Sequence, residues 1–291
     1  MKLIITSFLL LFSMLISAQD FQGKAIYQSK TSFDFSQMGP RAQQMSEEQK
    51  KQMLDRMKPM LEKTYVLTFN KSESVFKEEE KLEAPGQGGG WGRMMGKSFS
   101  PGKQYKDIKE NKWLEKRDFF GKQFLIKEPL KKLDWKLGSE TKIIGNYTCY
   151  KATAIKEVDE MDWRSMRRRK PKTSEDKDSL AKDSISNKDP MSEIETPKTI
   201  EVTAWYTPQV PVSQGPSKYW GLPGLILEVN ADRTTILCTK IVMNPGEKET
   251  IEAPSKGKEV TTKEYNDIVK KKMEEMREMY RGRRGGGGFR H

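Results

Sequence analysis

Hydrophobic and polar residues alternate along several short stretches of this chain, which predicts a protein built mainly of β-strands. Turn residues such as Gly145 and Asn146 separate neighbouring stretches, and no long helices alternate with them. Short turns between such stretches favour antiparallel hairpins over a doubly wound parallel sheet. We therefore expect a mainly β fold of the α+β type, with one curved, mostly antiparallel sheet. The clearest stretches are 23–30, 65–69, 113–117, 120–126 and 147–155.

Two segments instead show apolar residues at helical spacing. Ser46 precedes Gln49 and Thr261 precedes Glu264, and each pair has the form of a capping box. We expect two peripheral amphipathic helices, the first kinked or ended at Pro59 and the second stopped at Gly282. A methionine stripe on the first helix favours packing over a metal or lipid contact, because methionine readily fills gaps. The apolar positions are Met53, Leu54, Met57, Met60 and Leu61, then Tyr265, Ile268, Val269, Met273, Met276 and Tyr280.

The segment 157–198 breaks this pattern, because it carries Arg, Lys, Ser, Asp and Glu with few apolar residues. Such a composition buries too little surface to offset the entropy of ordering. We expect a disordered insertion within a single domain of residues 19–255. Its basic residues around Arg167 suit contact with anionic lipid or lipopolysaccharide, and a solvated surface excursion is the alternative. The glycine-rich stretch 84–102 reads as a flexible loop that lacks the context of a phosphate-binding loop.

The first residues resemble a secretory signal peptide, with Lys2 before an apolar run and Ala18 before Gln19. The run is too short to span a bilayer comfortably, and no second apolar segment of spanning length follows. The sequence thus predicts a signal peptide at 1–18, export, and a mature chain without a transmembrane segment. A C-terminal helix at 256–281 and a basic Gly/Arg tail at 282–291 complete the expected organisation.

The most distinctive stretch is the hexapeptide that begins at Gly221 and reads GLPGLI. Pro223 and Gly224 suit the two central positions of a type II turn, so Gly221, Pro223 and Gly224 are expected to form a structural corner. Residues 225–229 and 234–242 then predict a hairpin with a buried first arm. Aromatic residues interleaved with prolines come just before the corner and predict a rigid ridge that binds a ligand or partner. The residues of this ridge and corner are Trp205, Tyr206, Tyr219, Trp220, Leu222 and Pro223.

With these residues the sequence AWYTPQVPVSQGPSKYWGLPGLILEV resembles the signature block of the GLPGLI family, secreted envelope proteins of the Bacteroidota. The likeness covers roughly residues 24–242 apart from the insertion. It implies export and a β-rich fold. The activity of that family is unknown, so the resemblance assigns no catalytic residue to this chain.

Composition narrows the possible chemistry. The single histidine, His291, excludes serine–histidine and cysteine–histidine constellations and zinc sites built on several histidines. We expect no metal, no cofactor and no catalytic residue, because the carboxylates lie mostly in polar runs and turns. The two cysteines, Cys149 and Cys238, are candidates for a disulfide in an oxidising compartment, with two buried free thiols as the alternative.

The charge of the chain indicates which kinds of partner it could bind. The chain is 35% hydrophobic and 32% charged, with a formal net charge of +12 and a pI near 9.4. Export argues against nucleic acid, so an envelope protein, a lipid or lipopolysaccharide is the expected partner. We expect a non-enzymatic binding or accessory protein of the periplasm or outer membrane, and a carboxylate-based periplasmic hydrolase is the alternative function.

Overall fold

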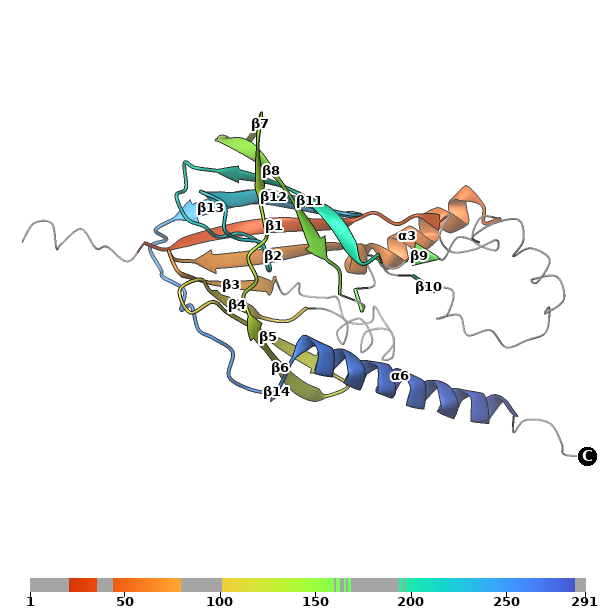
Figure 1. The fold of residues 1–291 in the computed structure, drawn as a ribbon. Coiled ribbons are helices and arrows are strands. Elements are labelled where there is room, and N and C mark those ends of the chain that lie inside the picture. Colours follow the sequence, from red (N-terminus) through yellow and green to blue (C-terminus); the bar gives the residue numbers. More distant parts are fainter. Residues whose placement is uncertain are drawn as a thin grey trace, which may run out of the picture.

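The computed structural model describes residues 21–35, 44–79, 101–159, 161–162, 165, 167–168, 194–195 and 197–285. One sheet of twelve strands contains all the long strands, in the order β14-β6-β5-β4-β3-β2-β1-β13-β12-β11-β8-β7. Figure 1 shows the sheet running from β7 at the top to β14 at the bottom, with both helices α3 and α6 on the right of the strands. The strands are β1 (Gly23–Thr31), β2 (Glu62–Phe69), β3 (Glu73–Glu78), β4 (Gln104–Asp107), β5 (Lys112–Phe119), β6 (Lys122–Pro129), β7 (Lys136–Ile144), β8 (Tyr147–Glu157), β11 (Thr199–Thr207), β12 (Leu225–Ala231), β13 (Thr234–Met243) and β14 (Lys258–Val260).

This architecture confirms the mainly β fold with a curved, mostly antiparallel sheet. Neighbouring strands of the chain pair as hairpins through turns that local sequence specifies. Phe120 and Gly121 both have positive φ between β5 and β6, as a tight hairpin turn requires. One edge of the sheet is the exception to antiparallel pairing, because β14 pairs with β6 in parallel. That pairing joins segments far apart in the sequence, which local patterns do not encode.

Strand β1 lies in the interior of the sheet, between β2 and β13. Its alternate residues Ala25 and Tyr27 are fully buried, and the Tyr27 hydroxyl donates to the carbonyl oxygen of Ile226 at 2.7 Å. Tyr27 also meets Phe76 edge to face, with ring centroids 6.1 Å apart. The main hydrophobic core therefore joins β1, β3 and β12 around one buried tyrosine.

Both helices begin at the capping boxes that the sequence predicts. Helix α3 (Glu47–Leu61) starts after Ser46, whose side chain accepts from the backbone N–H of Gln49, and it ends two residues beyond Pro59. In front of helix α6 (Thr262–Gly285), Glu264 accepts from the backbone N–H of Thr261. The expected stop at Gly282 is wrong, since α6 continues to Gly285. A single glycine inside a helix lowers the stability of the helix by about 1 kcal/mol, and it does not end the helix unless a turn forms there.

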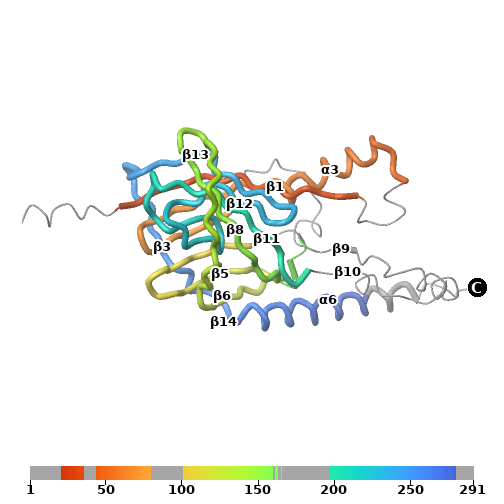
Figure 2. The backbone as a smooth tube through the Cα atoms, turned by 45° about the horizontal axis from the view of Figure 1, so that its top comes forward, coloured from red at the N-terminus to blue at the C-terminus, as the bar shows by residue number. Residues whose placement is uncertain are grey.

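Helix α6 packs against one end of the sheet, as both views show (Figure 1, Figure 2). Tyr265 and Val269 are buried with Phe119 and Phe124 of β5 and β6. The Tyr265 ring lies edge to face with Phe124, with centroids 5.5 Å apart. This cluster is separate from the main core, so α6 and β14 close the β6 edge together.

The predicted insertion is only partly described. Inside it, β9 (Arg167–Arg168) pairs with β10 (Ile194–Glu195), which corrects the expectation of a wholly disordered segment at these positions. Asp159 at its start accepts from the side chain of Asn266 on α6 at 2.8 Å. Residues 160, 163–164, 166, 169–193 and 196 of the insertion lie outside the described residues. So do the predicted signal peptide at 1–18, residues 80–100, which contain most of the glycine-rich stretch, and residues 286–291 of the basic tail. No helix among the described residues is both long and apolar enough to cross a membrane.

The expected disulfide is absent, because Cys149 and Cys238 are both buried free thiols. Cys149 is on β8 and Cys238 is on β13, and β11 and β12 lie between these strands. Neighbouring strands are about 4.8 Å apart, while a disulfide needs Cα atoms about 4.4–6.8 Å apart. The structure therefore matches the alternative of two free thiols. Burial raises the pKa of Cys149 to about 11 and that of Cys238 to about 12.

We predict that both thiols react slowly in the folded protein and quickly once it unfolds. A pKa raised by about two units leaves about a hundredfold less thiolate at pH 8. Alkylation of the unfolded chain without reductant, followed by mass spectrometry, should label both Cys149 and Cys238. Labelling that appears only after reduction would show that a bridge forms.

Candidate functional site

The GLPGLI corner lies in the long connection between β11 and β12. Its turn is tighter than predicted, because the N–H of Gly224 donates to the carbonyl oxygen of Leu222 at 2.8 Å across Pro223. The next N–H, of Leu225, donates to Val210 rather than closing a type II turn. The corner exists where expected, but its hydrogen bonds tie it to the preceding part of the same connection.

Gly224 allows this connection to touch β11. A Cβ atom at this position would lie 2.2 Å from the carbonyl oxygen of Thr207 and 2.5 Å from its carbonyl carbon. Real Cβ atoms do not approach backbone so closely, and the φ of +157° adds to the preference for glycine. The contact explains why a glycine is required at this point of the hexapeptide.

The six residues of the predicted ridge do not form one exposed surface. Tyr206, Tyr219 and Leu222 are 6%, 5% and 1% exposed and belong to the main core. Trp205 and Trp220 are half-buried, and Pro223 is exposed. The structure thus places half of the ridge inside the protein, where it holds the connection on the sheet.

The two half-buried tryptophans are fixed by polar contacts. The Trp220 indole donates to the carbonyl oxygen of Lys131 at 3.1 Å, and its own carbonyl accepts from the Trp135 indole at 2.8 Å. The Lys142 ammonium lies 4.3 Å from the centre of the Trp205 ring and 2.6 Å from the Glu228 carboxylate. Trp220 therefore joins the connection to the segment before β7, while Trp205 belongs to a separate polar contact.

A buried lysine is the main feature that sequence reasoning missed. Lys106 on β4 is 1% exposed, and its Nζ donates to the carbonyl oxygens of Gly215 at 2.6 Å and Tyr219 at 3.0 Å. Burial lowers its pKa to about 7. Nothing in the local sequence marks Lys106, because lysines near it at 103, 109 and 112 look alike.

Other buried polar side chains surround Lys106. Ser74, Lys106 and Trp113 are directly opposite one another on β3, β4 and β5, so their side chains share one face of the sheet. Gln104 lies two residues along the same face, and Gln214 precedes Gly215 in the covering connection. We call these five residues the Lys106 cluster. Four of them carry buried polar atoms without a hydrogen-bond partner among the described residues, namely Ser74 Oγ, Gln104 Oε1, Trp113 Nε1 and both amide atoms of Gln214.

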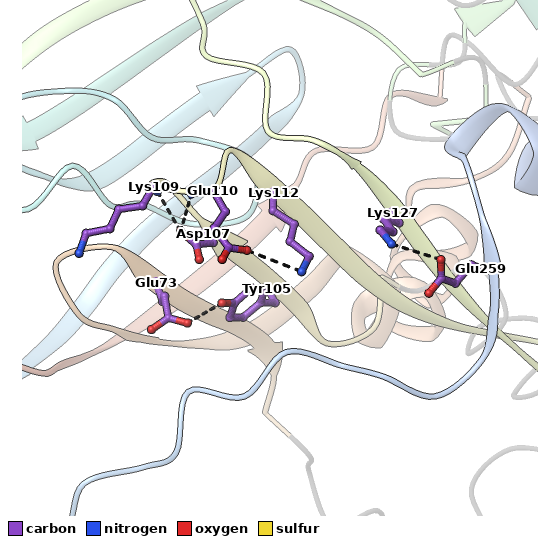
Figure 3. A network of polar contacts seen from close by, with 8 residues as sticks. All are labelled: Glu73, Tyr105, Asp107, Lys109, Glu110, Lys112, Lys127 and Glu259. Atoms are coloured by element: carbon purple, nitrogen blue, oxygen red, sulfur yellow. Dashed lines mark hydrogen bonds and ion pairs between the residues drawn. The ribbon is translucent and has the colours of Figure 1, made fainter.

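The nearby charged groups are paired with one another. Glu115 on β5 is 3% exposed and accepts from Arg117 at 2.8 Å, and Lys218 lies 3.9 Å from Glu128 on β6. On the opposite face, Figure 3 shows Tyr105 donating to Glu73 and Asp107 accepting from the backbone of Lys109 and Glu110. No described carboxylate lies within ion-pair distance of Lys106.

The described residues offer little for the chemistry of other site types. No group of three or more His, Cys, Asp or Glu residues in the described part of the chain could hold a metal ion. The two buried carboxylates, Asp107 and Glu115, point to opposite faces of the sheet, because Glu115 faces Gln104 and Asp107 lies an odd number of residues away on β4.

At the far edge of the sheet, the β7–β8 hairpin exposes apolar side chains. Leu137 is 61% exposed, Ile143 76% and Tyr150 37%. Leu137 lies opposite Ala152, Thr141 opposite Tyr150, and Ile143 opposite Thr148, which places the three apolar side chains on one face of the hairpin. Tyr150 reaches the buried Tyr206, with ring centroids 6.1 Å apart. We call Leu137, Ile143 and Tyr150 the hairpin patch.

Comparison with known proteins finds a family model that matches about a third of the chain. Residues 135–228 match the family described as "Protein of unknown function (Porph_ging)", which confirms the predicted GLPGLI resemblance. The match runs from just before β7 into β12, so it includes the hairpin patch and the corner. No curated protein matches the chain.

Two solved structures of PNGF-II, in the C2 and P21 space groups, are similar over 86% of the chain at 13% identity and a TM-score of 0.45. The chain covers 32% and 33% of those proteins, about a third of their length.

We predict that Gly224→Ala destabilises the protein by about 1–3 kcal/mol, because the new Cβ would meet the backbone of Thr207. Gly246→Ala is the matched control, since no atom lies within 4 Å of a Cβ there, and it should change stability by less than about 0.5 kcal/mol. Urea denaturation measures both. Equal midpoints for the two variants would contradict the close approach.

We also predict that the free energy of unfolding rises between pH 7 and about 8.5 because of Lys106. In this range its amine is neutral in the folded protein and protonated in the unfolded chain, so the unfolded state binds more protons. The slope contributed is up to about 1.4 kcal/mol per pH unit. Denaturation of Lys106→Met should lack this slope, while Lys151→Met, at a surface ion pair, should keep it. A slope that persists in Lys106→Met would contradict the assignment.

Proposed function

We propose that this protein is exported to the cell envelope and binds another envelope protein, without catalysis, through the hairpin patch. The observation that carries the proposal is the exposure of Leu137, Ile143 and Tyr150 together on one face. Large apolar side chains gathered on a surface with a polar border are typical of protein contacts. The location within the family-matching segment supports the same choice.

The charged side chains of the hairpin lie on the face opposite the patch, because Lys142 is opposite Cys149 and Lys151 is next to Tyr150 on β8. Lys142 is held by Glu228 at 2.6 Å, and Lys151 by Glu140 at 2.7 Å. These ion pairs therefore stabilise the hairpin from its other face, and the apolar side chains of the patch provide most of the binding energy. Thr141 and Thr148 lie on the patch face between the apolar side chains, which favours a protein surface of mixed apolar and polar groups over a lipid layer.

The form of β7 suggests how the partner binds. As the last strand of the sheet it has one unpaired edge, but its register with β8 shifts between Leu137 and Thr141. Irregular pairing and charged residues on an edge strand discourage the addition of another strand. We therefore infer that the partner contacts the side chains of the hairpin patch and does not extend the sheet.

Export is part of the proposal and rests on the signal-peptide pattern before Gln19, together with the family resemblance. The alternative of a carboxylate-based hydrolase has no supporting geometry among the described residues. Its two buried carboxylates point to opposite faces of the sheet, and Glu115 is paired with Arg117.

The test is site-specific photocrosslinking in the native envelope. A photoreactive side chain at Ile143 should capture one discrete protein, whereas one at Ile155 should not. Ile155 is 63% exposed and is the matched control, because it projects from the other face of the same hairpin.

Leu137→Lys should lower capture at position 143 about tenfold or more, because burying an unpaired ammonium costs more than the roughly 1.4 kcal/mol that a factor of ten represents. The melting temperature should stay nearly constant, since Leu137 is exposed. Crosslinks to lipid alone, or equal capture from both faces, would overturn the proposed function.

A further inference from the structure

We propose that the Lys106 cluster is a binding site for a small, singly charged anion, held between the sheet and the connection that carries the GLPGLI hexapeptide. The ligand is a halide or a small carboxylate. This site lies on β3, β4 and β5, so the inference does not depend on the hairpin patch or its partner.

The charge of Lys106 is the first observation. The side chain is 1% exposed, and both of its described partners are neutral backbone carbonyls, at Gly215 and Tyr219. Two carbonyls use two of the three N–H donors of an ammonium group and leave its charge unbalanced. A buried charge is costly unless it is paired. An anion would supply the missing pair and accept the remaining N–H.

The unpartnered polar atoms are the second observation. Ser74 and Trp113 flank Lys106 on the adjacent strands and offer an O–H and an N–H that no described residue accepts. Gln214, which is fully buried beside Gly215, has neither amide atom paired. Leaving such a group buried without a partner is costly, so several of them buried together favour an additional occupant.

The kind of donor favours an anion over a cation or an apolar molecule. Lys106, Ser74 and Trp113 all donate, and the indole N–H can only donate. The amides of Gln104 and Gln214 present either their oxygen or their NH₂ group, because a half-turn of the amide exchanges the two. Ser74, Lys106 and Trp113, which lie side by side on adjacent strands, can therefore direct donors at one small acceptor.

The surrounding charges cannot replace that acceptor. The titratable groups on this face of the packed strands include Glu78 of β3, which is paired with Lys63, Glu115 and Arg117 of β5, and Glu128 of β6. The connection adds Lys218 and Tyr219. Glu115 is paired with Arg117, and Glu128 is near Lys218. Lys218 also lies 5.3 Å from the centre of the Trp113 ring, which adds positive potential beside the cluster. Burial without a counter-ion lowers the pKa of Lys106 to about 7, and an anion beside it would raise that pKa again.

A crystal of the protein soaked in sodium bromide tests the site directly. We expect an anomalous bromide peak within hydrogen-bond distance of Lys106 Nζ and at least one of Ser74 Oγ and Trp113 Nε1. Ordered water at these atoms, with bromide confined to the surface, would overturn the inference, because water would then satisfy the cluster.

Unfolding in solution gives a second test. At pH 6.5 and constant ionic strength, with bromide replacing gluconate, each tenfold rise in bromide above the dissociation constant should stabilise the protein by about 1.4 kcal/mol. The response should disappear in Lys106→Met and remain in Lys151→Met. It should weaken about tenfold in bromide affinity for each pH unit above the pKa of Lys106, since the neutral amine does not pair with an anion.

Ser74→Ala keeps the test decisive if Lys106→Met fails to fold. The Ser74 hydroxyl has no described partner, so its removal should preserve the fold while it lowers bromide affinity about three- to tenfold. A stronger response to formate than to chloride assigns the site to carboxylates, and the reverse order assigns it to halides. A wild-type protein that responds to neither, or responds equally in Lys106→Met, has no such site. None of these results depends on crosslinking from position 143.

Discussion

A buried loop must satisfy its own peptide groups, and this constraint determines how the connection between β11 and β12 is built. Loops normally run over the surface because water satisfies their N–H and C=O groups. Here the connection is packed on the sheet, and separate hydrogen bonds satisfy its backbone carbonyl oxygens. Leu225 donates to Val210, Ile226 donates to Gln214, and Lys106 donates to Gly215 and Tyr219. The aromatic and aliphatic side chains of the signature block then fill the space that the backbone encloses.

Those features of the fold that depend on neighbouring residues can be predicted from the sequence. Hairpin turns such as Gly145–Asn146 and the capping boxes at Ser46 and Thr261 depend on residues next to one another, so they can be read directly. Pairings between distant segments cannot. The parallel contact of β14 with β6, at Val260 and Ile126, brings together segments whose patterns are compatible with many neighbours.

The candidate site was harder to predict than the fold. Aromatic residues near prolines indicate bulk, but they do not say whether that bulk lies inside or outside. Tyr206 and Tyr219 lie inside because the connection folds back on the sheet. The sequence did not identify Lys106 either, because lysine is almost always exposed and only tertiary packing buries it. The thiols of Cys149 and Cys238 share a β unit, yet sharing a sheet does not make strands neighbours.

The place of β1 in the sheet has a consequence for how the chain folds. One edge of β1 pairs with β2, which follows soon after in the sequence, so that side can form early. Its other edge pairs with β13, where Gly23 lies opposite Met243. Contacts of such large sequence separation slow folding, because loop-closure entropy is lost before the contacts form. During synthesis or translocation from the N-terminus, β1 therefore has an open hydrogen-bonding edge until almost the whole chain has emerged. Until β13 pairs with it, that edge can pair with another strand, so a partner that covered the edge during synthesis would protect β1 from premature pairing.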